Sequence, residues 1–578
     1  MEVTAQPLPL NAGELDADLG VLHAHAGAWS RLPLAEKIAY LRSMRAATVA
    51  VAADWVARAA EAKGIAKTPL AGEEWFSGPY AVVIAIDRLI VTLTALAQTG
   101  TVAPQPSARV DAAGHVDVDV FPLDSADRIL LSGVRATTVM EPSVRLDTLP
   151  AQTAEFYHRS EPRASVMLVL GAGNIASIAP LDVLDALFTR GSAVMLKLNP
   201  VNAYLRPFLA AVFGSLIEAG FVRIADGGAD VGAYLCAAEA IDAIHLTGGE
   251  RTHDAIVFGT GPEGEARKRA AEPLVRKPVT SELGNVTPVI VVPGPWSDPD
   301  IAFQAAHVAT MKMHNAGANC IAAQVVITRA GDPLAARFVA AVRDALREAP
   351  ARPTYYPGSR ERQHAITAQH PTAESLLPPG GGDPRTFVPG LDPKNTAEPL
   401  FTTECFGPVL AQTALSGADE AEFLRNAVAF CNDVLYGTLG ASILIHPHTI
   451  AKLGAAFDDA VRALRYGSVA INTWPGVAFL LPTASWGAYP GNTLAQAGSG
   501  IGIVHNASLF DRPEKTITRA PFAPFPRSFG DGELTLLPKP PWFVTHRRAE
   551  EVGRRMFAFV ANPSPLRMLT TALAAMRG

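Results

Sequence analysis

A cysteine near the middle of the chain is the residue best suited to covalent chemistry. Cys320 lies in the segment 311–323, in which Asn315 and Gly317 are turn-prone residues that follow an apolar run of helical period over 301–313. This order predicts a helix and then a loop that carries Cys320, and a thiol held there can act as a nucleophile. The alternative is a small buried hydrophobic residue, which is the common fate of a free cysteine.

Composition bounds the class of protein. The chain has 578 residues, and its 49 basic and 55 acidic side chains give a net charge of -6, which predicts two or three domains and no nucleic-acid partner. The four cysteines, Cys236, Cys320, Cys405 and Cys431, lie far apart with no CxxC spacing, so we expect neither a metal site nor disulfides among them. Free thiols of this kind predict a reducing, cytoplasmic setting. Residues 1–7 lack a basic start followed by an apolar run, so we expect no secretory signal.

Hydrophobic periodicity predicts a helical lead-in before the chemistry-bearing part of the chain. Residues 32–62 have the pattern of two amphipathic helices, and residues 75–97 that of a third. Residues 80–97 of the third are the best candidate for a membrane span, but Asp87 and Arg88 interrupt them, so we expect a buried helix. Residues 101–149 break into period-two segments, which predicts short strands in an edge or arm.

Strands alternate with helices from residue 164 onward, which predicts α/β layers with parallel sheets. The turn 171–176, Gly-Ala-Gly-Asn-Ile-Ala, joins a strand to a helix as a dinucleotide-binding loop does. However, the next strand, 192–198, carries Lys197 where such a loop requires an acidic residue. Further along, Thr247, Gly248 and Gly249 form a second tight turn suited to lie next to a phosphate, and a strand region is expected over 278–285 and onward through 288–293.

Four motifs, in order, resemble the aldehyde dehydrogenase superfamily over residues 156–519. The family's Asn-x-Gly-x-x-Cys loop is 315–320 here, its Glu-Leu-Gly strand end is 282–284, and its Glu-x-Phe-Gly-Pro is 404–408. Asn174 and Lys197 have the family's spacing between catalytic asparagine and cofactor-binding lysine. The resemblance implies an α/β fold with two Rossmann-type, doubly wound parallel-sheet domains and a small β oligomerisation arm.

The resemblance also implies a division of the chain. Residues 1–149 are expected as N-terminal helices and a β insert packed on the cofactor domain, 150–165 as part of the oligomerisation arm, and 166–281 as the NAD(P)-binding domain. Residues 282–488 would form the catalytic domain, 489–526 a return segment with an oligomerisation strand, and 527–578 a cationic extension. A homodimer or homotetramer is expected.

By the same resemblance, Cys320 is the nucleophile that forms a thiohemiacetal and then a thioester. Asn174 and the Cys320 backbone N–H would hold the oxyanion, and Glu282 would be the general base. Asn174 would then face the substrate, so the turn 171–176 would not hold the pyrophosphate; an ordinary phosphate loop is the alternative for that turn.

The cofactor residues implied by the resemblance are Lys197 and Glu404 for the two riboses, Phe406 beside the nicotinamide, and Thr247, Gly248 and Gly249 near the phosphates. Pro200 stands where the family often has an acidic residue that would repel a 2'-phosphate. Because that carboxylate is absent, the cofactor is expected to be NAD or NADP.

These residues predict NAD(P)-dependent oxidation of an aldehyde to its carboxylic acid. Residues 284–288, Gly-Asn-Val-Thr-Pro, also resemble the coenzyme A-dependent branch, so an acylating dehydrogenase or acyl-CoA reductase is an alternative, although Glu282 favours hydrolysis. A second alternative is an inactive family member with a structural or binding role. The arginine-rich tail 547–577 is expected either to contact a membrane surface or to dock as a helix on its own subunit.

Overall fold

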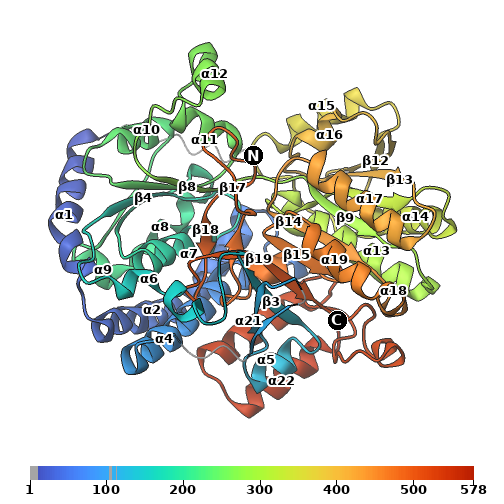
Figure 1. The fold of residues 1–578 in the computed structure, drawn as a ribbon, viewed down its shortest axis with the longest axis horizontal. Helices are drawn as coiled ribbons and strands as arrows, with labels where there is room; N and C mark the ends of the chain where they lie inside the picture. Colours follow the sequence, from blue (N-terminus) through green and yellow to red (C-terminus); the bar gives the residue numbers. More distant parts are fainter. Residues whose placement is uncertain (1–10, 103–106, 112) are drawn as a thin grey trace.

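The fold is described by a computed structural model for residues 11–102, 107–111 and 113–578, so the segment 1–7 considered for a secretory signal lies outside the described residues. Two large sheets organise the two lobes of the molecule (Figure 1). The parallel strands of both sheets are buried on both faces, as the runs of apolar residues predict.

The six-stranded sheet is the doubly wound domain predicted for the cofactor. Its order is β17-β8-β7-β4-β5-β6, and all pairings are parallel except that of β17. The order reverses between β4 and β7, which is where such sheets bind ligands at the carboxyl ends of the strands. The strands are β4 (Val166–Leu170), β5 (Ala193–Lys197), β6 (Val222–Ala225), β7 (Ala243–Thr247), β8 (Val279–Glu282) and β17 (Gly500–Ile501).

Helices from distant parts of the chain cover this sheet. One face packs on α1 (Ala12–Ser30), and the other on α2 (Leu34–Ala62), α4 (Ala81–Thr99) and α7 (Ile178–Leu184). The remaining helices of this lobe are α6 (Glu155–His158), α8 (Arg206–Val212), α9 (Gly214–Glu218), α10 (Ala229–Ala237), α11 (Glu250–Val257) and α12 (Gly261–Ala270).

The second sheet has eleven strands in the order β1-β2-β3-β19-β15-β14-β9-β10-β13-β12-β11. Its central strands are parallel, and its two ends are antiparallel. The strands are β1 (Ala108–Val110), β2 (Val116–Phe121), β3 (Arg135–Met140), β9 (Thr287–Val291), β10 (Ala323–Arg329), β11 (Glu374–Leu376), β12 (Arg385–Leu391), β13 (Val409–Leu415), β14 (Gly440–Leu444), β15 (Ser468–Ile471) and β19 (Pro513–Arg519).

The helices of this second lobe follow from local sequence. In α14 (Pro333–Glu348), Asp332 caps the first turn, and an apolar residue recurs every fourth position to make the buried face. The other helices are α13 (Asp298–Met313), α15 (Ser359–Gln369), α16 (Pro399–Thr402), α17 (Glu420–Asp433), α18 (Pro447–Leu453), α19 (Ala455–Ala463) and α20 (Pro475–Phe479).

The strand region expected to run through 278–293 is in fact two strands in two different sheets. β8 ends at Glu282 in the six-stranded sheet, and β9 begins at Thr287 in the eleven-stranded one. The prediction of a continuous strand was wrong because Gly284 and Asn285 lie between the two strands, and tertiary pairing places each strand in a different sheet. As a result, Glu282 lies at the seam between the two lobes.

The N-terminal helices differ from the prediction in one respect. Residues 34–62 form the single helix α2 rather than two, because no glycine or proline interrupts them, and α1 precedes it. Residues 69–99 are long and apolar enough to span a membrane, but half of the apolar window is buried inside the protein. Asp87 in this stretch pairs with Arg45 of α2 at 2.5 Å, and Arg88 pairs with Asp127 at 3.1 Å. These contacts agree with the predicted buried helix.

That stretch is not a straight helix. A short helix, α3 (Gly72–Trp75), leads into a π-helical turn over Phe76–Tyr80, and α4 follows. Gly78 has non-helical dihedral angles within the turn, and Pro79 follows it. Wide turns of this kind are frequent at functional sites.

The predicted arm strands β1–β3 extend the eleven-stranded sheet of their own chain, because β3 pairs with β19 and β19 pairs with β15. Residues 150–165 contribute no strand to the arm. They contain the short helix α6, and Phe156 of that helix packs against Gly191 at the start of β5, where a Cβ on the glycine would lie 1.9 Å from its ring.

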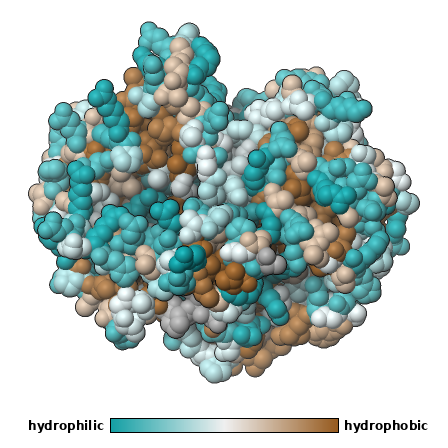
Figure 2. Space-filling model, in the orientation of Figure 1, coloured by the Kyte–Doolittle hydropathy of each residue, from teal (hydrophilic) through white to brown (hydrophobic). Residues whose placement is uncertain are grey.

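The cationic tail folds as α21 (Ala549–Ala561) and α22 (Pro565–Ala575), and α5 (Ser125–Leu130) lies beside α22. Val552, Met556 and Phe557 of α21 are buried against α3, the π-turn and α4. This is the docked arrangement, one of the two expected. The C-terminal helices lie at the lower edge of the molecule in Figure 1, and Figure 2 shows hydrophobic surface along that edge. Large apolar side chains remain exposed along the C-terminal segment: Phe529, Leu534, Leu536, Leu566, Leu569, Leu573 and Met576.

Candidate active site

The loop that carries Cys320 is held in an unusual backbone conformation. α13 begins with a capping box of Ser297 and Asp300 and ends before His314. Asn315, Ala316 and Gly317 then have positive φ angles of 52°, 57° and 76°. At Gly317 a Cβ would come within 2.4 Å of a backbone oxygen, so the residue must be glycine for the loop to pack.

Cys320 is the one partly exposed cysteine of the four, and it points at a carboxylate. Its Sγ donates a hydrogen bond to Glu282 Oε1 at 3.1 Å, and Trp486 Nε1 donates to Glu282 Oε2 at 3.0 Å. Burial raises the pKa of Glu282, and burial together with Glu282 and Glu404 raises the pKa of the Cys320 thiol well above its usual value. The resting thiol is therefore protonated, and the carboxylate beside it can accept its proton as sulfur attacks.

Asn174 is held beside the same loop by a small network. Its Nδ2 donates to the backbone oxygen of Ala318 at 2.9 Å, and its own backbone oxygen accepts from Asn315 Nδ2 at 3.1 Å and from the Tyr355 hydroxyl at 3.0 Å. The turn 171–176 thus faces the cysteine loop and presents an amide donor there.

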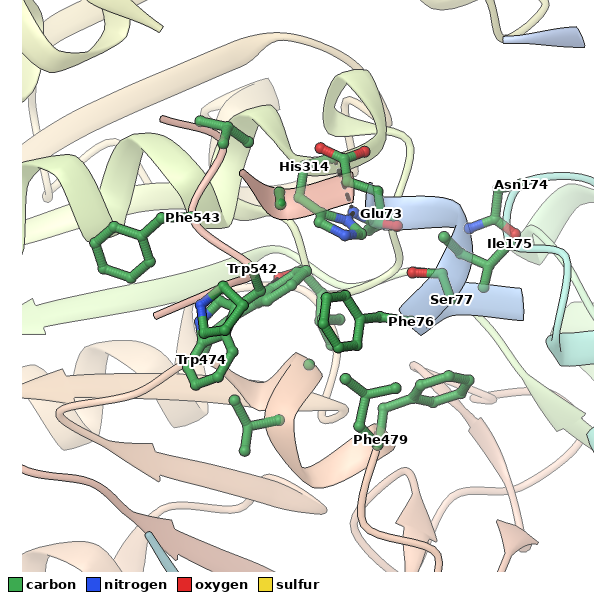
Figure 3. Close-up of a pocket in the computed structure, with 18 of the residues that line it drawn as sticks. Glu73, Phe76, Ser77, Asn174, Ile175, His314, Trp474, Phe479, Trp542 and Phe543 are labelled. Carbon is green, nitrogen blue, oxygen red and sulfur yellow. Dashed lines mark hydrogen bonds between the residues drawn. The ribbon is translucent and has the colours of Figure 1, made fainter. Parts of the chain in front are cut away.

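Asn174 and Cys320 line one narrow cavity of about 60 Å³. Aromatic and aliphatic side chains make most of its wall, and Figure 3 shows Phe76 from the π-turn and Trp542 from the C-terminal segment pointing into it. Its wall also includes Ile175, Ile178, Trp474, Val477, Phe479 and Leu480. This cavity, which we call the catalytic cavity, is suited to an apolar substrate whose reactive group reaches Cys320.

Three of the residues predicted for the cofactor lie at the carboxyl edge of the six-stranded sheet. Lys197 ends β5, where burial lowers its pKa while Asp230 and Asp226 oppose that effect. Gly248 and Gly249 are exposed and lead into α11, with open space around Gly249. Backbone N–H groups at such a helix start suit a phosphate. Thr247 instead turns its hydroxyl inward, to Asp182 at 3.0 Å.

The other two predicted cofactor residues are held more tightly. Glu404 is half-buried against Gly284 and accepts the backbone N–H of Asn285 at 3.2 Å, and desolvation raises its pKa to about 7. Phe406 has a positive φ of 45° and packs edge-on against Tyr356, with ring centroids 4.9 Å apart. Glu404 lies near enough to Cys320 and Glu282 for its charge to affect the pKa of the Cys320 thiol. Within the described ranges, no group of three or more His, Cys, Asp or Glu side chains could hold a metal ion.

Comparison with known proteins identifies the family. The profile of the aldehyde dehydrogenase family matches residues 134–486. The chain belongs to this family. It is 28% identical over 263 residues to a coniferyl aldehyde dehydrogenase of Pseudomonas sp., a match that covers 42% of this chain and 50% of that protein. The chain thus matches about half the length of this curated relative.

Solved aldehyde dehydrogenases share the fold at low sequence identity. An aldehyde dehydrogenase of Mycobacterium tuberculosis in complex with NAD+ has a TM-score of 0.60 at 19% identity, covering 88% of this chain and 91% of that chain. An NADP-dependent glyceraldehyde-3-phosphate dehydrogenase of Bacillus halodurans in complex with NADP has a TM-score of 0.56 at 17% identity, covering 88% and 92%.

The sequence did not predict two features of this site. Trp486 orients Glu282, and Glu73 of α3 accepts the Asn315 backbone N–H at 3.0 Å while pairing with buried Arg352 at 2.8 Å. Glu73 of α3 therefore holds the loop that carries Cys320 in place. A signal was available for Glu73, because Glu73 and Glu74 stand directly before an apolar helix, where buried charges need partners.

Proposed function

We propose that this chain oxidises an aldehyde to its carboxylic acid with NAD or NADP as the acceptor. The observation that carries the proposal is the 3.1 Å hydrogen bond from the Cys320 thiol to Glu282 at the wall of an apolar cavity that Asn174 also lines. A nucleophile and an amide donor that line one cavity, with a carboxylate hydrogen-bonded to the nucleophile, match the needs of thiol addition to a carbonyl.

Each residue has a role that follows from its position. Glu282 takes the proton of Cys320 as sulfur adds to the carbonyl carbon, and the Asn174 amide with the Cys320 backbone N–H stabilises the resulting oxyanion. A nicotinamide cofactor held by Lys197, Gly248 and Gly249 would supply the hydride acceptor for the oxidation. After Glu282 has lost the proton taken from Cys320, its carboxylate can activate the water molecule that releases the acid from the Cys320 thioester.

Lys197, Gly248 and Gly249 would hold the dinucleotide. Lys197 forms no salt bridge within the described part of the chain, so its amine has donors to offer a ribose or phosphate. The solved relatives named above were crystallised with NAD+ and with NADP, which supports either cofactor.

The test is NAD(P)H absorbance with a panel of short, aromatic and long-chain aldehydes, with and without coenzyme A. Turnover without coenzyme A is expected, and it should vanish in Cys320→Ala. Cys431→Ala, which alters a buried cysteine of the eleven-stranded lobe, is the matched control and should stay active. Turnover only with coenzyme A would favour the acylating branch, and no turnover with any acceptor would favour a non-catalytic family member.

We also propose a cytoplasmic homodimer or homotetramer. The four free cysteines support the reducing setting, and gel filtration with light scattering tests the assembly. The exposed leucines at the start of α22, Leu566 and Leu569, support a peripheral membrane contact. Flotation with anionic liposomes tests that contact, and equal absence of binding by full-length and tail-deleted protein would remove it.

A further inference from the structure

A second, larger cavity of about 510 Å³ lies directly behind the catalytic cavity. Its walls come from α4, α5 and the C-terminal helices α21 and α22. The two cavities have five wall residues in common, so only side chains separate them: Phe76, Val477, Leu480, Pro541 and Trp542. We call it the C-terminal cavity.

The C-terminal cavity is apolar, and its few charges already have partners. Its lining includes Ile129, Leu130 and Leu480, which remain only partly buried and so offer apolar surface that no protein atom covers. At the rim, Arg88 pairs with Asp127 at 3.1 Å. Because no charge is left to bind a carboxylate or phosphate, the lining suits a neutral hydrocarbon.

Phe76 and Trp542 are two of the side chains that separate the catalytic cavity from the C-terminal cavity. Phe76 stands on the π-helical turn that breaks the long apolar helix, and Figure 3 places it between Trp542 and Ile175. The Trp542 indole N–H is buried and has no hydrogen-bond partner among the described residues.

We propose that the C-terminal cavity binds the hydrocarbon chain of a long aliphatic aldehyde whose carbonyl group lies at Cys320. The chain passes Phe76 and Trp542 when the Phe76 side chain turns aside. The proposal rests on the proposed function for the reaction, but the binding site is defined by the cavity alone. Each methylene that enters apolar surroundings should raise kcat/KM about fourfold until the chain is fully covered.

The kinetic test uses a substitution that places a large side chain in the C-terminal cavity. Ala572 of α22 lines the cavity, whereas its neighbour Leu573 faces solvent with 45% of its surface exposed. In the parent, kcat/KM should rise from hexanal to dodecanal. Ala572→Trp should lower the dodecanal-to-hexanal ratio roughly tenfold or more, and Leu573→Trp should leave it unchanged. A parent with no dependence on chain length, or equal effects of both substitutions, would overturn the proposal.

A binding test separates this proposal from the reaction. In the Cys320→Ala protein, 1-dodecanol should displace the neutral fluorescent probe 1-aminoanthracene, and Ala572→Trp should weaken that displacement while Leu573→Trp does not. If dodecanol binds in this way but no aldehyde is oxidised, the cavity assignment stands and the proposed function fails. If aldehydes are oxidised but Ala572→Trp does not change the displacement of the probe by dodecanol, the proposed function stands and the cavity assignment fails.

Discussion

Replacing Trp486 by phenylalanine removes one hydrogen bond from Glu282 and little else. The indole N–H donates to Glu282 Oε2 at 3.0 Å, and the ring, only 2% exposed, packs edge-on against Phe479 with centroids 5.4 Å apart. A phenyl ring retains most of that packing. The carboxylate, already raised in pKa by burial, then loses a donor that favours its charged form.

A hydrogen bond to a charged group contributes about 1.5–3 kcal/mol, which corresponds to an upward shift of the Glu282 pKa by about one to two pH units. Only the ionised carboxylate can accept the thiol proton, so activity falls as pH drops through this pKa. The acid limb of kcat/KM against pH should therefore move to higher pH by that amount in Trp486→Phe. Above the new limb, the rate should return toward that of the parent.

Trp296→Phe is the matched control. Trp296 is buried at 5% exposure and packs against aromatic rings, but its indole N–H has no hydrogen-bond partner among the described residues. Its substitution should leave the acid limb in place. An unmoved limb in Trp486→Phe, or the same shift in both variants, would refute the assignment of Glu282 as the base held by Trp486.

Three further predictions test the role of Glu73 in holding the cysteine loop, the cofactor site and the oxyanion donor. Glu73→Gln breaks a buried ion pair with Arg352 and should lower the free energy of unfolding by about 3–5 kcal/mol in urea titrations. Glu61→Gln, which removes one partner of an exposed ion pair, should lower it by about 0–1 kcal/mol. Equal losses in the two variants would contradict the role of Glu73 in holding the cysteine loop. Asp226 lies near Lys197, where its charge would oppose a 2'-phosphate, so Asp226→Ser should raise the NADP-to-NAD ratio of kcat/KM, and an unchanged ratio would exclude its role. Asn174→Ala should lower kcat by about 100- to 1,000-fold, and a change confined to KM would argue against an oxyanion donor.

Much of the fold could be read from local patterns. The strand predicted over 192–198 is β5, and the helical run over 301–313 lies within α13, because β-prone residues and the helical repeat of apolar residues act within a few positions. The extent of α2 and the separation of β8 from β9 could not be read in the same way. Each depends on which surface the segment packs against in the folded chain.

For the site, the sequence by itself determined the candidates: the local pattern indicated Cys320 on a loop after a helix, and the resemblance to the aldehyde dehydrogenase family implied Glu282 and Asn174 as its partners. Only the tertiary structure decided that Cys320 and Glu282 touch, that Trp486 and Glu73 hold them, and that the C-terminal helices wall a second cavity. Residue type and short-range spacing carry chemical capacity, whereas contacts across hundreds of residues arise from how apolar faces are buried together, which no local pattern encodes.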